Sequence, residues 1–502
     1  MLVAIRADAS QEIGTGHIVR CLTLADALKQ RGARIRFISR HLPEHLRNIL
    51  ETKGHEITLL DSPRDNATLD ELVHARWLGV GQARDAEDSI LALSDLTWDW
   101  LVVDHYALDF RWESMLRKAA KRIMTLDDIA DRRHDCDVLL DQNYYADGAA
   151  RYADKAPAHC KMLLGPRYAL LRDEFLQLRG QIKARNGPVR RVLVFFGGVD
   201  ADNYTGRAIE ALCGAEIPDL HVDVVIGAQH PCREQIKAAC AQHGFICHVQ
   251  TDRMAKLMAN ADLAIGAGGS TTWERCCLGL PSLAICTADN QRKQIAEAAY
   301  GSLLYAPELE SELIPAIRRH VIALMENGFL RQAISRNGMQ AVDGRGVLRV
   351  TGNLDCNGIE IRVAVPDDSE KLFEWRNHPT IRAVSRKPDV INWEDHQKWF
   401  ASVASSPDRL LLIGHCKGSP VGVVRFDIKS DEASISIYLV PDIKQPVQGC
   451  DLLQCAEYWL TANRPEVHKV SAHVLGGNDR SQRLFSGAGY QVESINYSKG
   501  LH

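Results

Sequence analysis

The sequence predicts two α/β lobes built on parallel sheets, followed by a separate α+β domain. In the first two thirds of the chain, short apolar runs rich in β-branched residues alternate with helical patterns, as in right-handed βαβ units. From about residue 359 onward, apolar runs follow one another across short turns, which indicates antiparallel strands. The length of 502 residues suits about three domains of ordinary size.

The first lobe begins with a strand and a loop whose residues suit ligand binding or catalysis. Residues 2–6 are typical of a buried strand, and apolar residues recur at helical spacing over residues 18–28. Between them, Gly14 and Gly16 allow the backbone to approach a ligand at the positive end of the helix. His17 is expected at the carboxyl edge of the sheet, where a histidine can take a proton from water. The residues alone leave open whether His17 is catalytic or only caps the helix.

Three further strands of this lobe end in polar clusters. The strands are expected near residues 101–103, 123–126 and 138–140. The clusters that follow them are Asp104-His105-Tyr106, Asp127-Asp128 and Asp141-Gln142-Asn143. An acid at a strand end is often only a helix cap or a turn former. Because the carboxyl ends of parallel strands share one edge of the sheet, three such endings together favour a site there.

A glycine-rich turn marks the second lobe. A strand that begins near Ala264 leads into Gly268, Gly269 and Ser270, and the helix that follows carries Glu274 in its first turns. The amides of the turn and the helix dipole suit a diphosphate, and Glu274 could accept hydrogen bonds from ribose hydroxyls. The chain has no Gly-Lys-Ser/Thr sequence, which excludes a P-loop, and the turn lacks the spacing of a dinucleotide fingerprint.

The composition narrows the class of protein. The formal net charge is −4, which argues against nucleic acid or a membrane surface as partner. No apolar run reaches the ~18–20 residues of a membrane span. The N-terminus lacks a signal-peptide pattern, so we expect a cytoplasmic protein. The 14 cysteines are scattered without paired Cys-x-x-Cys sets, so we expect reduced thiols and no metal site.

The motifs of both lobes resemble known families. The stretch from Gly266 to Glu274, with Asn290-Gln291, is similar to the nucleotide-sugar half-site of GT-B enzymes, particularly the UDP-GlcNAc transferase of peptidoglycan synthesis. Over about residues 1–345, the chain resembles the UDP-sugar hydrolase of pseudaminic acid biosynthesis. The first-lobe motifs that carry this resemblance are Arg6 to Ser10, Gly14 to His17, Asp104 to Tyr106, Asp127 to Arg132, Asp141 to Asn143 and Gly165 to Tyr168. The resemblance implies two Rossmann-like lobes, 1–175 and 176–345, in GT-B arrangement.

This resemblance also implies a reaction. The family hydrolyses UDP-2,4-diacetamido-2,4,6-trideoxy-β-L-altropyranose to UDP and the free sugar, with water attacking the anomeric carbon and no metal. His17 is then the expected base that deprotonates the water. The expected substrate-binding residues are Asp8, Gly14, Gly16, Tyr106, Gly268, Gly269, Ser270, Glu274, Asn290 and Gln291. The sequence leaves open whether the sugar is of the pseudaminic, legionaminic or bacillosamine type.

The last third has a different pattern. A turn-rich stretch over residues 346–358 is expected to be a linker, and the α+β domain is expected over residues 359–502. Trp375-Arg376-Asn377, the strand near residues 422–427 and the segment 478–490 resemble the GNAT acetyltransferases. That family uses acetyl-CoA, and its pyrophosphate binds at a turn that opens a helix.

The resemblance places coenzyme A against a defined set of residues. They are Lys444, Gln448, Gly449, Asn478 and Ser481. Two positions depart from the family pattern: Val447 stands where a glycine is usual, and Phe485 stands where many relatives carry a tyrosine general acid. These departures leave open a degenerate domain.

Together, the two resemblances predict a bifunctional enzyme. One part hydrolyses the UDP-linked amino sugar, and the other N-acetylates the 4-amino group of the preceding UDP-sugar. Two alternatives remain at this point. One is a GT-B glycosyltransferase with a UDP-sugar donor, and the other is a UDP-sugar-binding scaffold with a degenerate acetyltransferase domain. The oligomeric state is not predicted.

Overall fold

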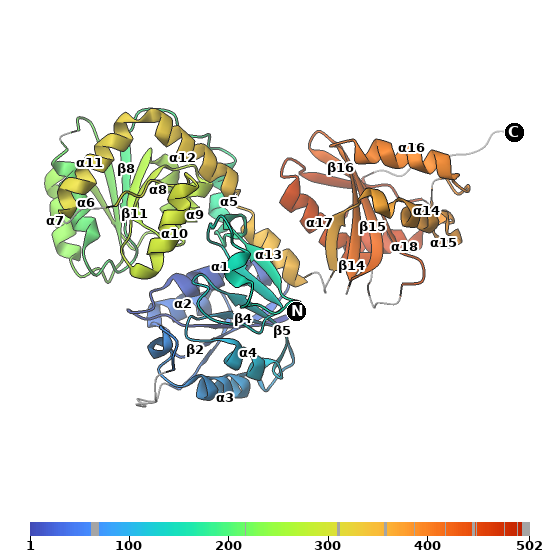
Figure 1. The fold of residues 1–502 in the computed structure, drawn as a ribbon, viewed down its shortest axis with the longest axis horizontal. Helices are drawn as coiled ribbons and strands as arrows, with labels where there is room; N and C mark the ends of the chain where they lie inside the picture. Colours follow the sequence, from blue (N-terminus) through green and yellow to red (C-terminus); the bar gives the residue numbers. More distant parts are fainter. Residues whose placement is uncertain are drawn as a thin grey trace. The chain divides into compact units, whose positions relative to one another are not determined.

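The chain forms two compact units, Met1–Val347 and Leu348–His502 (Figure 1). The computed structural model describes residues 1–61, 70–215, 217–308, 312–355, 359–385, 387–416, 418–443, 447, 449–475, 477–488 and 490–493. The first unit contains two parallel sheets, and the second contains a mainly antiparallel sheet. The predicted succession of α/β lobes and an α+β domain is therefore confirmed. Within the described parts of the chain, every helix is too short or too polar to serve as a membrane span.

The sheet of the first lobe places the loop before His17 at its middle. Its strands, in spatial order, are β3 (Glu56–Leu59), β2 (Arg34–Ser39), β1 (Leu2–Ala7), β4 (Trp98–Asp104), β5 (Ala120–Leu126), β6 (Val138–Asp141) and β7 (Lys161–Leu164). All neighbouring strands described in this sheet are parallel. Strand order reverses between β1 and β4, so the crevice beyond their carboxyl ends is the position where such sheets bind ligands.

The helical segments of this lobe follow the alternation expected from the sequence. They are α1 (Gly16–Gln30), α2 (Glu44–Thr52), η1 (Ala75–Leu78), α3 (Gln82–Leu93), α4 (Phe110–Leu116), η2 (Ala150–Tyr152) and η3 (Pro166–Tyr168). On α1, the residues Ile18, Cys21, Ala25 and Leu28 are buried, which matches the predicted apolar face. Because α1 begins directly after the loop, its first turn lies at the switch point between β1 and β4.

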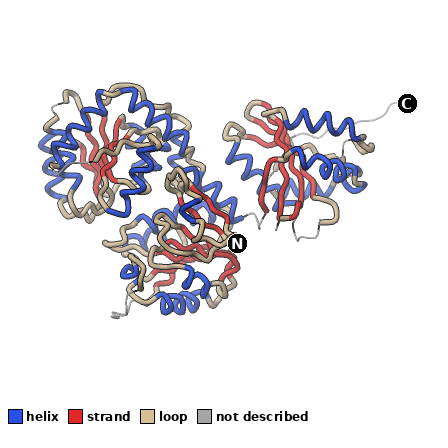
Figure 2. Tube along the Cα trace, in the orientation of Figure 1, coloured by secondary structure: helices blue, strands red, loops and turns tan. Residues whose placement is uncertain are grey.

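The second lobe repeats this plan. Its strands, in spatial order, are β10 (Ile246–Val249), β9 (His221–Ile226), β8 (Arg191–Phe195), β11 (Leu263–Ala267) and β12 (Ser282–Ile285). Its helices are α6 (Tyr204–Cys213), α7 (Arg233–His243), α8 (Met254–Asn260), α9 (Thr271–Cys277), α10 (Asp289–Tyr300), α11 (Leu313–Glu326) and α12 (Gly328–Ala341). Figure 2 shows helices on both faces of the strands. The glycine-rich turn joins β11, the neighbour of the central strand β8, to α9.

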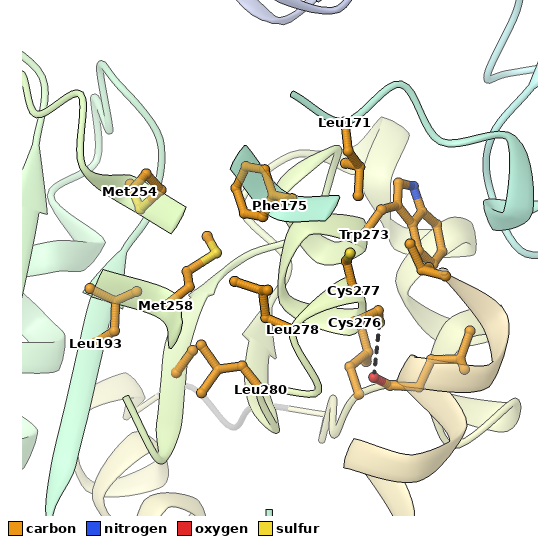
Figure 3. Packing of buried hydrophobic residues seen from close by; sticks show 14 of the residues in the cluster. Leu171, Phe175, Leu193, Met254, Met258, Trp273, Cys276, Cys277, Leu278 and Leu280 are labelled. Atoms are coloured by element: carbon orange, nitrogen blue, oxygen red, sulfur yellow. Dashed lines mark hydrogen bonds between the residues drawn. The ribbon is translucent and has the colours of Figure 1, made fainter. Parts of the chain in front are cut away.

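The chain enters the second lobe earlier than the predicted boundary at residue 175. Ala169, Leu171 and Phe175 lie in one hydrophobic cluster with residues of the second lobe such as Trp273 (Figure 3). Phe175 belongs to the short helix α5 (Asp173–Arg179) and is fully buried. The apolar residues that precede the first long strand of the lobe thus complete its core, which a strand-by-strand division of the sequence does not reveal.

The second unit is a curved layer of strands between helices. Its strands, in spatial order, are β13 (Ile359–Val363), β14 (Arg409–Cys416), β15 (Ser419–Lys429), β16 (Glu432–Leu439) and β17 (Lys469–Ala472). Its helices are η4 (Pro366–Asp368), α14 (Ser369–Asn377), α15 (Pro379–Arg382), α16 (Trp393–Ala404), α17 (Gly449–Asn463) and α18 (Asp479–Gly487). The pairs from β13 to β16 are antiparallel, whereas β16 and β17 are parallel and pair only up to Ile435 and Ala472.

The expected turn-rich linker is largely helical. Gly346–Asp355 forms α13, and Val347, Val350 and Leu354 are buried along it at helical spacing. The glycines and asparagines of this stretch suggested turns, but the apolar face decided the conformation because burial outweighs weak propensities. The boundary between the two units falls at the start of this helix.

The close approach of two backbones should make Gly227 intolerant of substitution. A Cβ on Gly227 would clash with the carbonyl oxygen of Gly198, at the carboxyl ends of β9 and β8. We expect Gly227→Ala to lower the free energy of unfolding by about 3 kcal/mol, because the backbone must move. Urea denaturation should show this loss. Gly187→Ala, where a Cβ meets open space, is the control; equal stability of the two variants would contradict the prediction.

Candidate active site

His17 and Asp104 form a buried pair at the carboxyl end of β4. Nδ1 of His17 lies 2.5 Å from Oδ1 of Asp104, and the side chains are 8% and 0% exposed. Burial favours a higher pKa for Asp104, but the charge of Arg20 and the hydrogen bonds from Arg20 and His17 outweigh it and hold the pKa well below its usual value. The ionised Asp104 can only accept hydrogen bonds, so we assign the proton of His17 to Nδ1. Nε2 then carries the lone pair that a general base needs.

Arg20 fixes this pair and extends it to the next strand. Arg20 follows His17 by three residues on α1, so both side chains share one face of the helix. Its Nε and Nη2 each lie 2.6 Å from the carboxylate oxygens of Asp104. Its Nη1 pairs with Asp128, which follows β5. A guanidinium stays charged at any accessible pH, so Arg20 keeps the Asp104 carboxylate ionised and joins the ends of two strands.

Aromatic rings surround His17. The ring of Tyr106 lies 4.7 Å from His17 in an edge-on arrangement, and its hydroxyl donates to Asp128 at 2.7 Å. Trp77 stacks on Tyr106 at 5.7 Å, and His74 lies 4.4 Å from Trp77. Burial raises the pKa of Tyr106 well above its usual value, so its hydroxyl stays protonated. These rings pack beside His17, and the sequence alone gave no reason to single out His74 or Trp77.

Asp8 has internal partners for its carboxylate. The side chain is fully buried, with Oδ1 2.6 Å from Nη1 of Arg6 and 2.7 Å from the backbone N–H of Arg40. Its other oxygen lies 3.3 Å from Nε2 of His105. This geometry favours a role in fixing the ends of β1, β2 and β4 over the predicted contact with a sugar. Gly14, with φ of +78°, closes the loop before α1 through its N–H to the carbonyl of Ser10.

The loop after β5 is held by a buried ion cluster. Asp127 accepts hydrogen bonds from the backbone N–H of Ala130 and from Arg132. His134 lies 3.0 Å from Glu113 and 3.5 Å from Asp127. Burial lowers the pKa of His134, but the two carboxylates outweigh it and raise the pKa to about 9. These contacts fix the loop that carries Asp128, the ion-pair partner of Arg20.

In the second lobe, Gln291 lies against the glycine turn. Gly269 has φ of +93°, a left-handed conformation that favours glycine. A Cβ on Gly268 would lie 3.4 Å from Oε1 of Gln291, and one on Gly269 would lie 3.8 Å from its Nε2. The predicted neighbours Gly268, Gly269, Ser270 and Gln291 are thus together in space. Asn290 lies in α10, but its side chain is outside the described residues.

Glu274 lies in the first turn of α9 and is largely buried. Arg172 is its nearest ion-pair partner, at 3.7 Å. Burial raises the pKa of Glu274 to about 7, against the opposing charges of Arg172 and Arg275. A carboxyl group with this pKa can accept hydrogen bonds from vicinal hydroxyls when ionised. Its position one turn beyond Ser270 agrees with the ribose contact that the sequence predicted, which remains a prediction.

The predicted coenzyme A residues of the second unit are only partly described. Lys444 and Gln448 lie outside the described residues. Gly449 begins α17. The amide oxygen of Asn478 caps α18 by accepting the backbone N–H of Ser481 at 3.1 Å, which is the role of an ordinary N-cap. Phe485, on the same helix, is 8% exposed and packs in the core.

Three arginines from α14, α15 and β15 lie close enough to interact electrostatically. They are Arg376, Arg382 and Arg425. One buried nitrogen of each has no hydrogen-bond partner among the described residues: Nη1 of Arg376, Nε of Arg382 and Nε of Arg425. Burial lowers the pKa of Arg376, and the charges of Arg425 and Arg382 add to the effect. Tyr438 on β16 acts on the pKa of Arg376 in the opposite direction. Burial raises the pKa of Tyr438 itself. Cations with unfilled donors are the arrangement that binds phosphate or carboxylate groups.

Residues 359–491 match the family model described as Acetyltransferase (GNAT) domain. This part of the chain is a GNAT acetyltransferase domain. The predicted resemblance is confirmed, and the domain implies acetyl-CoA as co-substrate. Among the described residues, no group of three or more His, Cys, Asp or Glu side chains is arranged to hold a metal ion.

Two known proteins are similar to the chain over different lengths. The UDP-2,4-diacetamido-2,4,6-trideoxy-beta-L-altropyranose hydrolase of Campylobacter jejuni is 25% identical to this chain. The aligned region covers 58% of this chain and 93% of the hydrolase. The uncharacterized protein MJ1062 of Methanocaldococcus jannaschii is 21% identical, and the aligned region covers 98% of this chain and 97% of that protein. The resemblance to the hydrolase that the motifs predicted is confirmed.

A solved structure has the same fold as the two lobes with parallel sheets. Phytolacca americana UGT2, complexed with UDP-2fluoro-glucose and pterostilbene, aligns with a TM-score of 0.51 and 10% identity, covering 68% of this chain and 94% of that chain. At this identity the likeness shows the fold alone. The chain therefore combines Rossmann-like lobes of GT-B type with a C-terminal acetyltransferase domain.

The raised pKa of His134 predicts how stability depends on pH. The protonated form is favoured in the folded state, so its contribution is complete below the ordinary histidine pKa and is lost as the pH rises through about 9. We expect the stability difference between wild type and His134→Gln to shrink by about 3 kcal/mol between about pH 6 and pH 9.5. Urea denaturation at each pH measures it. A difference that stays constant over this range would show that His134 is not charged in the folded protein.

Proposed function

We propose that the first unit hydrolyses a UDP-linked amino sugar to UDP and the free sugar, with UDP-2,4-diacetamido-2,4,6-trideoxy-β-L-altropyranose as the substrate. The observation that carries the proposal is the buried His17–Asp104 pair at the switch point of the first sheet. A histidine with Nδ1 held by a carboxylate is the form that activates water. The likeness to the Campylobacter hydrolase supports the reaction and the substrate class.

In this reaction His17 takes one proton from water through Nε2. The water oxygen forms a bond to the anomeric carbon, and the bond from that carbon to the phosphate oxygen breaks with its electron pair leaving on UDP. The imidazolium that forms on His17 is stabilised by the ionised Asp104, which Arg20 keeps in place. The sugar would lie among Tyr106, Trp77 and His74, whose rings surround His17.

The second lobe supplies the nucleotide site in this proposal. The amides of the turn from Gly268 to Ser270 would stabilise the charge that develops on the departing diphosphate. Gln291 lies beside the turn and can donate to a phosphate oxygen through its amide group. Glu274, one turn further along α9, would hold the ribose hydroxyls.

Replacement of His17 tests the reaction directly. We expect His17→Ala to slow UDP release from the diacetamido UDP-sugar by about a hundredfold or more, because water loses its base. The assay measures UDP release without added metal, and His45→Ala, an exposed histidine of the same lobe, is the control.

The alternatives give different results in the same assay. Release that requires an added acceptor would make the first unit a glycosyltransferase. Binding of the UDP-sugar without turnover by the wild type would make it a scaffold. Equal rates for wild type and His17→Ala would remove His17 as the base.

We further propose that the GNAT domain N-acetylates the 4-amino group of the UDP-sugar that precedes the hydrolase substrate. The arginine cluster near α14 supports this proposal, because unfilled guanidinium donors suit the diphosphate of such a substrate. In the transfer, the amine forms a bond to the acetyl carbon, the thioester bond breaks, and the amine proton leaves. Phe485 cannot supply a proton to the departing thiolate, so that proton comes from another group or from solvent.

Arg376 offers the sharpest test of this second activity. We expect Arg376→Gln to raise KM for the UDP-amino sugar at least about tenfold while KM for acetyl-CoA stays the same, because only the nucleotide sugar meets the arginines. Release of the coenzyme A thiol measures both constants. Lys371→Gln removes an exposed cation from the same helix and is the control. An equal rise in both KM values, or no rise, would contradict the assignment.

A further inference from the structure

One buried amide joins the two lobes of the first unit. Asn143 follows β6 in the first lobe and is 5% exposed. Its Oδ1 accepts hydrogen bonds from Nε2 of Gln294 at 2.6 Å and from Nε1 of Trp273 at 3.3 Å, both in the second lobe. Its Nδ2 donates to Oδ1 of Asp128 at 3.0 Å. The side chain therefore bonds to both lobes at once.

The chemistry of the partners requires an amide at this position. The indole of Trp273 can only donate, so it needs an acceptor, and the carboxylate of Asp128 that pairs with Arg20 needs a donor. Asparagine presents an acceptor to one lobe and a donor to the other. An aspartate would set a second carboxylate against Asp128, and an apolar residue would leave buried polar groups without partners. The orientation of the amide is fixed by these neighbours.

Asp128 connects Asn143 to His17. Its other carboxylate oxygen is paired with Arg20 and accepts the hydroxyl of Tyr106. Arg20 binds both oxygens of Asp104, which holds Nδ1 of His17. Each carboxylate along this path has a partner on each side, so a shift of one member displaces the next.

The partners of Asn143 in the second lobe belong to the predicted nucleotide site. Trp273 lies on α9, three residues after Ser270 at the end of the glycine turn. Gln294 lies on α10, three residues after Gln291, which packs against the turn. A ligand held at the turn therefore acts on the same two helices that donate to Asn143.

We propose that Asn143 is a positioning residue that couples occupancy of the nucleotide site to the orientation of His17. This inference rests on the proposed binding of UDP at the glycine turn. A nucleotide fixes α9 and α10, their donors fix the amide of Asn143, and the amide sets Asp128, Arg20 and Asp104 in turn. Water is then activated efficiently only when the nucleotide part of the substrate is in place, which limits attack on sugars that lack the nucleotide.

The experiment follows His17 by NMR in the full chain with isotope-labelled histidine, with His17→Gln to assign its signal and free UDP as the probe. In the wild type, UDP should shift the His17 ring signals. In Asn143→Ala, UDP should bind within about threefold of the wild-type affinity, but the shift of His17 should disappear. The kcat for hydrolysis should fall at least about tenfold with KM changed by less than about threefold, because the positioning acts on the chemical step.

Gln294→Met keeps the length of the side chain and removes its amide, including the donor to Asn143, so it tests the coupling with little disturbance of packing. Like Asn143→Ala, it should reduce the UDP-induced shift of the His17 ring signals. Asn337→Ala, which removes an amide elsewhere in the second lobe, should retain the full shift. If UDP shifts the His17 ring signals in both Asn143→Ala and Gln294→Met as much as it does in the wild type, the coupling is overturned. Failure of UDP to bind the wild type would instead overturn the proposed function, and the inference with it.

Discussion

The carboxylate of Asp104 is completely buried, and the candidate site of the first unit depends on keeping it paired. A buried ion without a partner costs several kcal/mol, so Arg20 and His17 cannot both be displaced from it without loss of structure. This requirement locks α1 against the end of β4. The same contacts that satisfy the charge also fix the tautomer of His17 and direct its second nitrogen to be the proton acceptor. Structural need and the proposed catalytic arrangement therefore coincide in one interaction.

Around that pair, most charged groups at the sheet edge serve to hold other groups. Arg6, Asp8, Asp85 and Arg40 form a separate buried network on the side of β1. Buried ion pairs add little net stability, but the removal of one partner is strongly destabilising, so such networks define one arrangement of loops. Polar strand ends thus have two uses here: a few residues face the proposed substrate, and their neighbours keep them in register.

The two units would recognise the same nucleotide sugar by different means. The first unit offers a glycine turn, whose amides are fixed in place and carry no net charge. The GNAT domain offers a cluster of arginines, which would bind the anionic diphosphate through charge and several donors. The two proposed reactions would account for this difference. A hydrolase must stabilise UDP as it departs and then release it, whereas an acetyltransferase needs the diphosphate only as a handle while the amine reacts.

The sequence by itself determined the principal strands and the glycine turns, because periodicity and glycine placement are local properties of the chain. It placed strands at residues 2–6 and 138–140, where the structure has β1 and β6. It did not reveal the helix α13, whose conformation depends on burial of its apolar face. Only the tertiary structure decided which polar residues meet. Arg20 and Asp104 are separated by 84 positions, and Asn143 and Trp273 by 130. No local pattern encodes such contacts, because they depend on how strands are ordered in the sheet and how the lobes approach each other. For the same reason, Asp8 seemed available to a ligand and proved to be buried.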